Sequence, residues 1–350
     1  MALHFVRRHF ARDLGIDLGT ANSLVYERGR GVVLREPSVV AVKNGPTKEI
    51  LAIGEEARQM IGRTPGDIEA IRPLNAGVIG DFNITREMIR YLIRKATKGR
   101  PFFKPRVVVS VTSQITDVER RAVTEATLWA GAREAFLIEE PVAAAIGAGL
   151  PVHEPSGNMV VDIGGGTTDI AVISLGSIVT GQLIRVGGEA FDEALARFIR
   201  RKFNLMIGER TAEDLKIAAA WAIEPTEKNN TAVEVRGRDH ISGLPKVITV
   251  QALEIFEAVQ EPLETIIAGI RTLLEHTPPE LLADIMDKEI VATGGGSLMR
   301  GFAERLAKEI RMPVRIADNP FESVVLGIGQ TLENLSKYQR LFIAAKKAAT

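Results

Sequence analysis

Residues 15–25, GIDLGTANSLV, have a close counterpart later in the chain at residues 161–172, VDIGGGTTDIAV. Each stretch reads as an apolar strand that ends in an aspartate, followed by an apolar residue, a glycine turn with a threonine, and a second strand. The two aspartates are Asp17 and Asp162. A supersecondary unit that recurs after about 145 residues indicates a duplicated domain, so the repeat predicts an α/β chain with two domains of one fold.

The two glycine turns are candidate anion-binding loops. A glycine turn between two strands can aim several backbone N–H groups at one anion, because no Cβ blocks the approach. Two such turns from two domains can hold a polyphosphate from both sides, with Asp17 and Asp162 facing one Mg²⁺ through water. Thr20, Thr167 and Thr168 offer hydroxyl groups to phosphate or metal. The alternative is that both are tight hairpin turns that bind no ligand.

A third glycine cluster, Gly294, Gly295 and Gly296 with Ser297, lies between an expected strand and an expected helix. The N-terminus of a helix favours a phosphate or the polar edge of a base. The alternative is close packing of the helix on the strand. The chain has no GxxxxGK[ST] motif, and no GxGxxG follows the first strand, which argues against a P-loop enzyme and a dinucleotide-binding dehydrogenase.

Between these motifs, apolar spacing predicts the remaining elements. The expected helices are 85–97, 117–131, an alanine-rich helix from Pro141, parts of 188–225, 251–275 and 298–310, and the further strands are 106–111, 135–138, 178–184 and 290–293. Residues 224–232 are expected to form a surface loop.

Composition limits the classes of function. The chain has 350 residues, enough for about two domains, and 44 basic residues balance 44 acidic ones. No overall field therefore indicates a nucleic-acid partner. The absence of cysteine excludes disulfides and thiol chemistry and fits a cytoplasmic protein. No apolar run approaches the ~20 residues of a membrane-spanning helix, and the N-terminal segment lacks the features of a signal peptide.

The motifs together resemble those of the actin, sugar-kinase and DnaK superfamily, which occur in the same order: GIDLGTANS (15–23), EEPVAAAIGAGL (139–150), VDIGGGTTD (161–169) and TGGGSL (293–298). Within it the chain resembles the MreB family of bacterial actin homologues, on stretches that include REPSVVAV (35–42), IRPLNAGVIGDF (71–82), LMIGERTAE (205–213) and TPPELLADIMDKEIVATGGG (277–296). One departure is VTSQ at 111–114, where family members commonly read VPSG. We expect this change to affect turnover more than nucleotide binding.

The resemblance implies an actin-like fold: two related ribonuclease-H-like domains, each with a smaller inserted subdomain, around a nucleotide cleft. The expected subdomains are IA at 1–36, 79–150 and 320–350, IB at 37–78, IIA at 151–186 and 247–319, and IIB at 187–246.

The resemblance also implies a site for ATP and Mg²⁺. Its residues would be Gly19, Thr20, Ala21 and Asn22 at the phosphates, Gly164, Gly165 and Gly166 opposite them, Gly294, Gly295, Gly296 and Ser297 at the base, and Glu213 and Lys216 at the ribose and adenine. Without the family, the last two would be read as an exposed ion pair one helical turn apart.

Glu140 matches the family position that orients or activates the attacking water, with Thr167 assisting. A carboxylate at a strand end that faces the γ-phosphate can orient a water for in-line attack. The alternative is that Glu139 and Glu140 only favour the positive N-terminus of the helix that Pro141 opens. The adjacent Glu139 is the competing candidate for the same role.

The implied function is that of a slow ATPase of the cytoskeleton, whose membrane-associated filaments, with paired protofilaments, govern bacterial cell shape by organising cell-wall synthesis. Its partners would be other copies of the chain, the inner face of the cell membrane and cell-wall elongation proteins. Phe102 and Phe103, flanked by Lys98, Arg100 and Lys104, are candidates for membrane contact. The alternative is that both phenylalanines pack in the core. The N-terminal segment is a second membrane candidate, or else a disordered tail.

Three other functions remain open on the superfamily resemblance alone. A metabolic kinase would need a base beside a sugar pocket, and a DnaK-like chaperone would need a substrate domain after the ATPase. A DNA-segregating filament would need a basic patch. The sequence shows none of these features.

Overall fold

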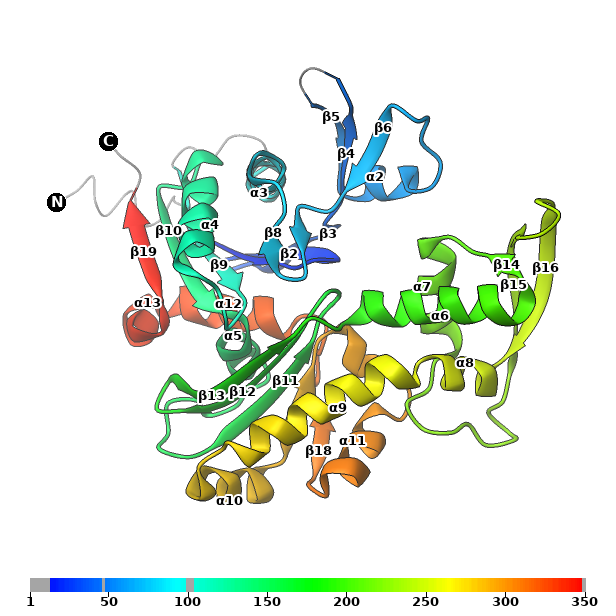
Figure 1. Ribbon diagram of the computed structural model, residues 1–350. Helices are drawn as coiled ribbons and strands as arrows, with labels where there is room; N and C mark the ends of the chain where they lie inside the picture. The colour runs from blue at the N-terminus through cyan, green and yellow to red at the C-terminus, as the bar shows by residue number, and fades with distance from the viewer. Residues whose placement is uncertain (1–12, 46–47, 99–103, 348–350) are drawn as a thin grey trace.

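The computed structural model describes residues 13–45, 48–98 and 104–347 (Figure 1). Two large β-sheets form its centre, and helices α5 (Glu140–Gly147) and α12 (Ser323–Glu333) lie between them. Helix α12 packs on the first sheet, α5 packs on the second, and the two helices pack against each other. The molecule is therefore layered as sheet, two helices and sheet, which is the arrangement of two α/β domains joined face to face.

The two sheets repeat one topology. The first sheet has the order β19-β10-β9-β1-β2-β3 and the second β13-β12-β11-β17-β18. In each, three antiparallel strands are followed by two parallel ones, beginning with the parallel pairs β1–β9 and β11–β17, and the first sheet has one further strand, β19, antiparallel to β10. The strands are β1 (Leu14–Leu18), β2 (Asn22–Glu27), β3 (Gly31–Pro37), β9 (Arg106–Val111), β10 (Glu134–Glu139) and β19 (Ala344–Lys347), and β11 (Asn158–Ile163), β12 (Thr168–Ser174), β13 (Ser177–Ile184), β17 (Ile290–Thr293) and β18 (Val314–Ile316). The duplication predicted from the two glycine turns is confirmed.

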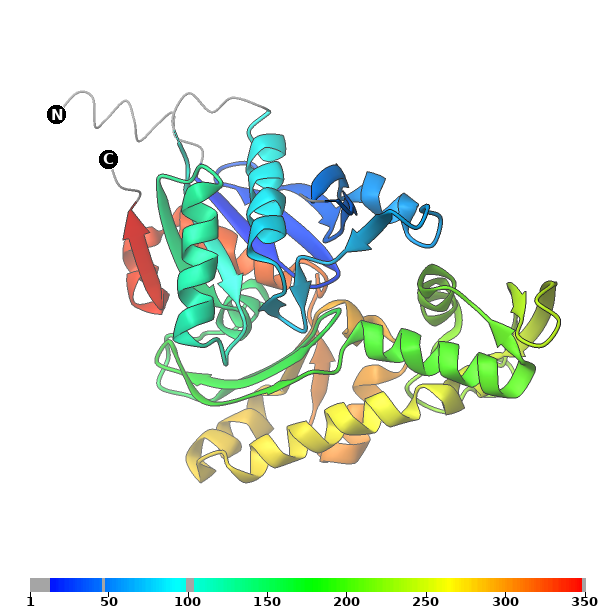
Figure 2. The same ribbon diagram turned by 45° about the horizontal axis from the view of Figure 1, so that its top comes forward.

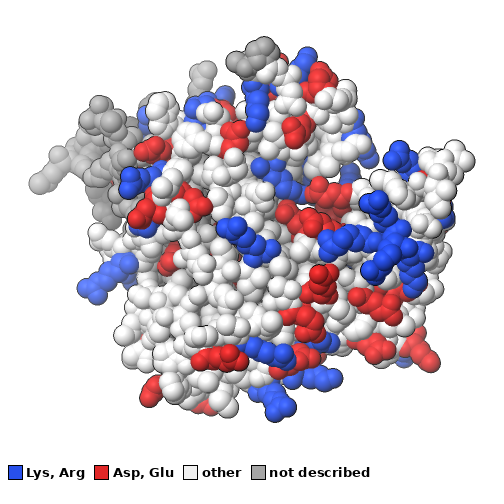
Figure 3. All heavy atoms as spheres, in the orientation of Figure 1, with Lys and Arg blue, Asp and Glu red and all other residues white. Residues whose placement is uncertain are grey.

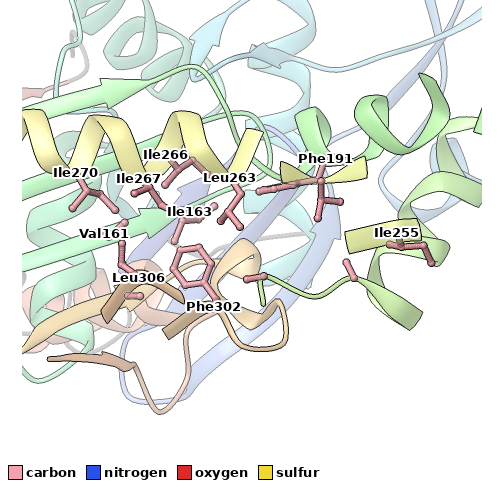
Figure 4. Packing of buried hydrophobic residues seen from close by; sticks show 14 of the residues in the cluster. Val161, Ile163, Phe191, Ile255, Leu263, Ile266, Ile267, Ile270, Phe302 and Leu306 are labelled. Carbon is pink, nitrogen blue, oxygen red and sulfur yellow. The ribbon is translucent and has the colours of Figure 1, made fainter. Parts of the chain in front are cut away.

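The outer face of each sheet is covered by helices. Helices α3 (Phe82–Ala96) and α4 (Asp117–Trp129) cover the first sheet, and α9 (Gln260–Glu275), α10 (Pro279–Lys288) and α11 (Phe302–Ile310) cover the second. Figure 4 shows how Val161 and Ile163 of β11 meet Ile266 and Ile267 of α9 and Phe302 of α11. Buried apolar side chains of this kind supply most of the free energy that holds the layers together.

The two inner helices approach closely because both carry glycine at the contact. A Cβ on Gly147 would lie 1.8 Å from the carbonyl oxygen of Ser323, and one on Gly327 would lie 1.8 Å from that of Ala143. No larger residue fits at either position without moving a helix. The contact matters because the chain passes from the first domain to the second through α5 and returns through α12.

Two smaller units extend from the sheets. The first arm comprises β4 (Val40–Lys43), β5 (Glu49–Ile53), α2 (Glu55–Met60), β6 (Ile68–Ile71) and the hairpin β7–β8 (Leu74–Asn75 and Val78–Ile79). The second arm comprises α6 (Gly188–Phe203), β14 (Leu205–Met206), α7 (Glu209–Ala219), β15 (Ala232–Asp239), β16 (Pro245–Gln251) and α8 (Ala252–Ala258). Figures 1 and 2 agree that the arms stand on the same side of the molecule and face each other.

Two expected elements differ in the structure. The predicted helix 251–275 is two helices that meet at Val259. Pro262 explains the break, since proline has no N–H to continue the helical ladder. The segment after the third glycine cluster forms a short 3₁₀ helix (Gly295–Leu298), and α11 begins only at Phe302. Within 188–225 the helices are α6 and α7, while residues 224–231 form the expected loop.

No helix in the described part of the chain is both long and apolar enough to cross a membrane.

Candidate functional site

The site begins where the two glycine turns meet. Asp17 ends the β1 side of one hairpin and Asp162 the β11 side of the other, each near the turn. A Cβ on Gly165 would lie 2.5 Å from the Cβ of Ala21, so the two turns face each other nearly in contact. Only glycine fits at Gly165 in this arrangement, which is the physical reason for its presence there.

A cavity of about 450 Å³ opens beside the facing turns. Most of the residues expected at the nucleotide line it: Asp17, Gly19, Thr20, Ala21, Asn22, Glu140, Asp162, Gly164, Gly165, Thr167, Glu213, Lys216, Gly294, Gly295 and Gly296. The sequence motifs, which are far apart in the chain, thus come together in the wall of one cavity. The volume falls in the range of pockets for small-molecule ligands.

Three of the expected residues lie behind that wall. Gly166 packs on Thr20, where a Cβ would come within 2.9 Å of its side chain. The Thr168 hydroxyl donates a hydrogen bond to the carbonyl oxygen of Val186 (2.8 Å). The Ser297 hydroxyl donates one to the carbonyl oxygen of Gly294 (2.7 Å). These contacts hold the glycine turns in shape from behind.

Buried carboxylates gather at the cavity: Asp17, Asp162 and Glu140 line it, and Asp169 does not line it but lies close enough for its charge to act on Asp162 and Glu140. Burial raises the pKa of Asp17 to about 6, although the hydroxyl of Ser110 donates a hydrogen bond to it (2.9 Å) and partly offsets the shift. Burial likewise raises the pKa of Asp169 to about 6, against two hydrogen bonds from Ser113. The pKa of Asp162 is raised well above its usual value by burial and by the charges of Asp17 and Asp169. A cation placed here would relieve this accumulation of negative charge.

Glu140 joins the same cluster at the first turn of α5. Burial, followed by the charges of Asp17, Asp169 and Asp162, raises its pKa well above the usual value. Its neighbour Glu139 is not among the cavity residues. The geometry therefore separates the two adjacent glutamates and places Glu140 at the cavity.

Within the described residues, no group of three or more His, Cys, Asp or Glu side chains is arranged to hold a metal ion directly.

The start of α6 supports the second turn. The N–H of Gly188 donates to the carbonyl oxygen of Gly164 (2.9 Å), and the N–H of Glu189 donates to that of Gly165 (2.8 Å). Lys216 reaches this segment from α7, where its ammonium donates to the carbonyl oxygen of Gly188 (2.9 Å). The turn is thus tied to α6 and α7 of the second arm.

Lys216 and Glu213 do not pair with each other, as the reading of an exposed ion pair would require. Lys216 lies 2.8 Å from a carboxylate oxygen of Asp192, and Glu213 lies 3.1 Å from a guanidinium nitrogen of Arg58. Burial raises the pKa of Asp192 to about 6, and the charge of Lys216 opposes that shift. Each residue is therefore held by a partner outside its own helix.

Sequence reasoning missed several residues of the cavity. Ile217, Leu298 and Phe321 line it although they are 67%, 59% and 40% exposed. Exposed apolar side chains around a pocket can cover the face of a flat ring. Arg72 and Asp192 also line the cavity. Arg72 belongs to the IRPLNAGVIGDF stretch, whose resemblance to the family was the available signal.

Phe102 and Phe103, expected at the membrane, lie outside the described residues, as does the N-terminal segment 1–12.

Two repeated domains around a cleft, with a glycine turn from each on its wall, define an actin-like protein. Solved structures of MreB5 of Spiroplasma citri, bound to ADP or AMPPNP, superpose with a TM-score of 0.88 at 34% identity, over 94% of this chain and 98% of theirs. The MamK double helical filament shares the fold, with a TM-score of 0.77 at 23% identity over 92% of this chain and 98% of the MamK chain.

The particular family follows from the sequence comparison. The MreB/Mbl protein family matches residues 11–340, so the chain belongs to that family. It is 50% identical over 328 residues to the cell shape-determining protein Mbl of Bacillus subtilis (strain 168), which covers 94% of this chain and 98% of Mbl. It is 48% identical over 338 residues to the cell shape-determining protein MreB of Escherichia coli (strain K12), which covers 95% and 96%.

Proposed function

We propose that this protein is a slow ATPase of the bacterial cytoskeleton, whose membrane-associated filaments govern cell shape by organising cell-wall synthesis. The observation that carries the proposal is the pair of glycine turns facing each other beside a cavity of about 450 Å³. The names of the Bacillus and Escherichia relatives support the role in cell shape. The Spiroplasma relative, bound to ADP and AMPPNP, supports an adenine nucleotide as the ligand.

The polyphosphate would lie in the cavity beside the facing turns. Gly19, Thr20, Ala21 and Asn22 of the first turn, and Gly164 and Gly165 of the second with Gly166 behind them, would surround its oxygens, and those of their backbone N–H groups that have no partner within the protein would donate to it. The base would rest against Gly294, Gly295 and Gly296, in the turn that Ser297 fixes. Glu213 and Lys216 would approach the ribose and the base from α7.

The acidic floor fits a divalent cation. Burial raises the pKa values of Asp17 and Asp162, and the negative charges of Asp17 and Asp169 raise that of Asp162 further. These two residues would hold Mg²⁺ through its water molecules, since Mg²⁺ prefers oxygen ligands and retains much of its hydration. When bound, the ion would neutralise charge on the phosphates and on the aspartates together.

Hydrolysis would depend on Glu140. Its carboxylate lines the cavity and its pKa is raised, so it is suited to orient a water molecule and accept its proton. Thr167, buried at the end of the second turn, would assist through its hydroxyl. Slow turnover suits a protein in which the nucleotide state controls filament assembly.

Filament assembly and membrane contact complete the proposal. The partners would be further copies of this chain in paired protofilaments, the inner face of the cell membrane and cell-wall elongation proteins, with no nucleic acid. Phe102 and Phe103 are the proposed membrane contact, on the strength of the cations beside them in sequence. The protein would then be cytoplasmic and peripheral on that membrane.

Electron microscopy of the purified protein on an anionic lipid monolayer with Mg-ATP tests the proposal directly. We expect ordered filaments on the lipid that disappear without nucleotide. A matched variant, with Phe102 and Phe103 replaced by serine, should keep ATP binding and lose lipid binding. Bare lipid with protein that still binds ATP would overturn the cytoskeletal role and leave the nucleotide site intact.

A further inference from the structure

Two arginines of the first arm reach across the mouth of the cleft to carboxylates of the second arm. Nη2 of Arg58, on α2, lies 3.1 Å from Oε2 of Glu213 on α7. Nε of Arg72, just after β6, lies 3.2 Å from Oε1 of Glu189 on α6, and its Nη2 pairs with Glu209 at the start of α7. Figure 3 shows basic and acidic groups side by side in the space between the arms.

These ion pairs are partly shielded from water. The side chains of Arg58 and Glu213 are 35% and 33% exposed, and those of Arg72 and Glu189 are 27% and 31% exposed. At such exposure a single pair adds little to folding stability. Their placement matters more, because each pair joins two units that are connected to the core through separate segments.

Arg72 also connects to both glycine turns. Its partner Glu189 donates its backbone N–H to the carbonyl oxygen of Gly165 in the second turn (2.8 Å). On the other side, Arg72 leads directly into the β7–β8 hairpin, where the N–H of Gly77 donates to the hydroxyl of Thr20 in the first turn (3.3 Å). Opening of the arms would therefore pull on both turns.

We propose that Arg58 and Arg72 are positioning residues that hold the two arms closed, and that release of a bound nucleotide requires the pairs with Glu213, Glu189 and Glu209 to break. This inference rests on the proposed nucleotide site. It states that the ion pairs determine how long a nucleotide stays bound there. The three pairs form a latch, a name used below for these five residues. The latch affects the opening of the cleft and not the hydrolysis of ATP.

The first test measures the separation of the arms without any nucleotide. The chain has no cysteine, so Gln59→Cys on α2 and Ala218→Cys on α7, both at exposed positions, accept spin labels at known places. Arg58→Gln with Arg72→Gln should lengthen and broaden the distance distribution between the labels. Arg63→Gln is the matched control, because Arg63 is exposed on the same arm and no carboxylate of the described residues pairs with it.

A charge exchange separates the latch from a general loss of packing. Arg58→Glu alone should open the arms, and Arg58→Glu with Glu213→Arg should restore the wild-type distances. Unchanged distances in the double glutamine variant, or no recovery in the exchange, would overturn the latch.

The second test measures release of a fluorescent ATP analogue after addition of excess ATP. Since a partly exposed ion pair shifts an equilibrium by a factor of about 1.4 to 5, we expect Arg58→Gln to speed release about 2- to 5-fold and the double variant about 3- to 10-fold. Arg58 does not line the cavity, so its effect cannot come from loss of a direct contact between its own side chain and the nucleotide. If Arg58→Gln released the nucleotide at the wild-type rate, the proposal that the latch controls nucleotide release would be overturned. A wild-type protein that binds no nucleotide would instead refute the proposed function, and the distance measurement would still decide the latch.

Discussion

Gly165 and Ala21 face each other across the cleft so closely that a Cβ on Gly165 would lie 2.5 Å from the Cβ of Ala21. The two residues belong to turns on different domains, more than a hundred residues apart in sequence. The distance between the domains at the proposed phosphate site is therefore limited by one methyl group. This contact can be altered and restored with two small substitutions.

Gly165→Ala should push the turns apart and weaken nucleotide binding. Overpacking of this kind costs about 1–3 kcal/mol, which corresponds to a loss of affinity of roughly 5- to 150-fold. Adding Ala21→Gly removes the 2.5 Å contact and leaves the backbone nitrogen of residue 21, at 3.2 Å, as the nearest atom. Titration with an ATP analogue should show partial recovery in the double variant. Equal affinities in the single and double variants would contradict the facing of the turns.

Glu140→Ala should keep nucleotide binding and lose most hydrolysis. Removal of a group that orients water and accepts its proton costs about 100-fold or more in turnover. Glu139→Ala is the matched control, because Glu139 is adjacent in sequence but does not line the cavity. Phosphate release under single-turnover conditions is the measurement. If turnover fell in Glu139→Ala and not in Glu140→Ala, the role of orienting the attacking water would belong to Glu139.

Asp17 should make the nucleotide-free protein less stable as the pH rises. Its pKa is 3.8 when unfolded and about 6 when folded, so the folded state binds more protons between these values. Stability from this group is present below about pH 4 and lost as the pH passes about 6. Asp17→Asn, which keeps an acceptor for Ser110, should stabilise the protein by about 1–3 kcal/mol at pH 7.5.

Denaturant unfolding at pH 4.5 and pH 7.5, with chelator and without nucleotide, checks this expectation. The difference between Asp17→Asn and the wild type should be large at pH 7.5 and small at pH 4.5. A difference of equal size at both values would show that the effect does not come from ionisation of Asp17. With Mg²⁺ and nucleotide present, the wild type should be more stable than Asp17→Asn, since the ionised aspartate then faces a cation.

The sequence was sufficient to predict the duplicated domain and the facing turns. Asp17 and Asp162 end buried strands, and the glycines after them require close approach, so both signals are local in the chain. Chain connectivity then places the two turns at equivalent points of the two sheets. Glu140 was predicted only through its match to the family position, because a glutamate at the start of a helix fits a contact with the positive helix N-terminus equally well.

Contacts between the arms could not be predicted in this way. The partners of Arg72 lie on α6 and α7, more than a hundred residues further along, and nothing in the local pattern marks them. The hairpin of β15 and β16 was also missed, although its strands alternate between exposed positions and partly or fully buried ones, as a half-buried sheet does. The partner of Lys216 could not be predicted for a related reason: Glu213 is nearer in sequence, but Asp192 is the carboxylate that folding buries beside it.

Lys216 and Asp192 form a largely buried ion pair. The side chains are 18% and 10% exposed, and Oδ1 of Asp192 is buried with no hydrogen-bond partner among the described atoms. Lys216→Met should therefore leave a buried carboxylate unpaired and destabilise the protein by about 2–4 kcal/mol. Lys228→Met, on the exposed loop 224–231, should cost little.

A double variant distinguishes loss of the charge pair from loss of the lysine itself. In Lys216→Met with Asp192→Leu no buried charge remains, and an apolar pair of similar volume is often as stable as the ion pair it replaces. Denaturant unfolding should show at least half of the lost stability recovered, while nucleotide affinity stays low because Lys216 no longer holds Gly188 behind the second turn. Stability that remains as low as in the single variant would mean that Lys216 acts on the fold through Gly188 and not through Asp192.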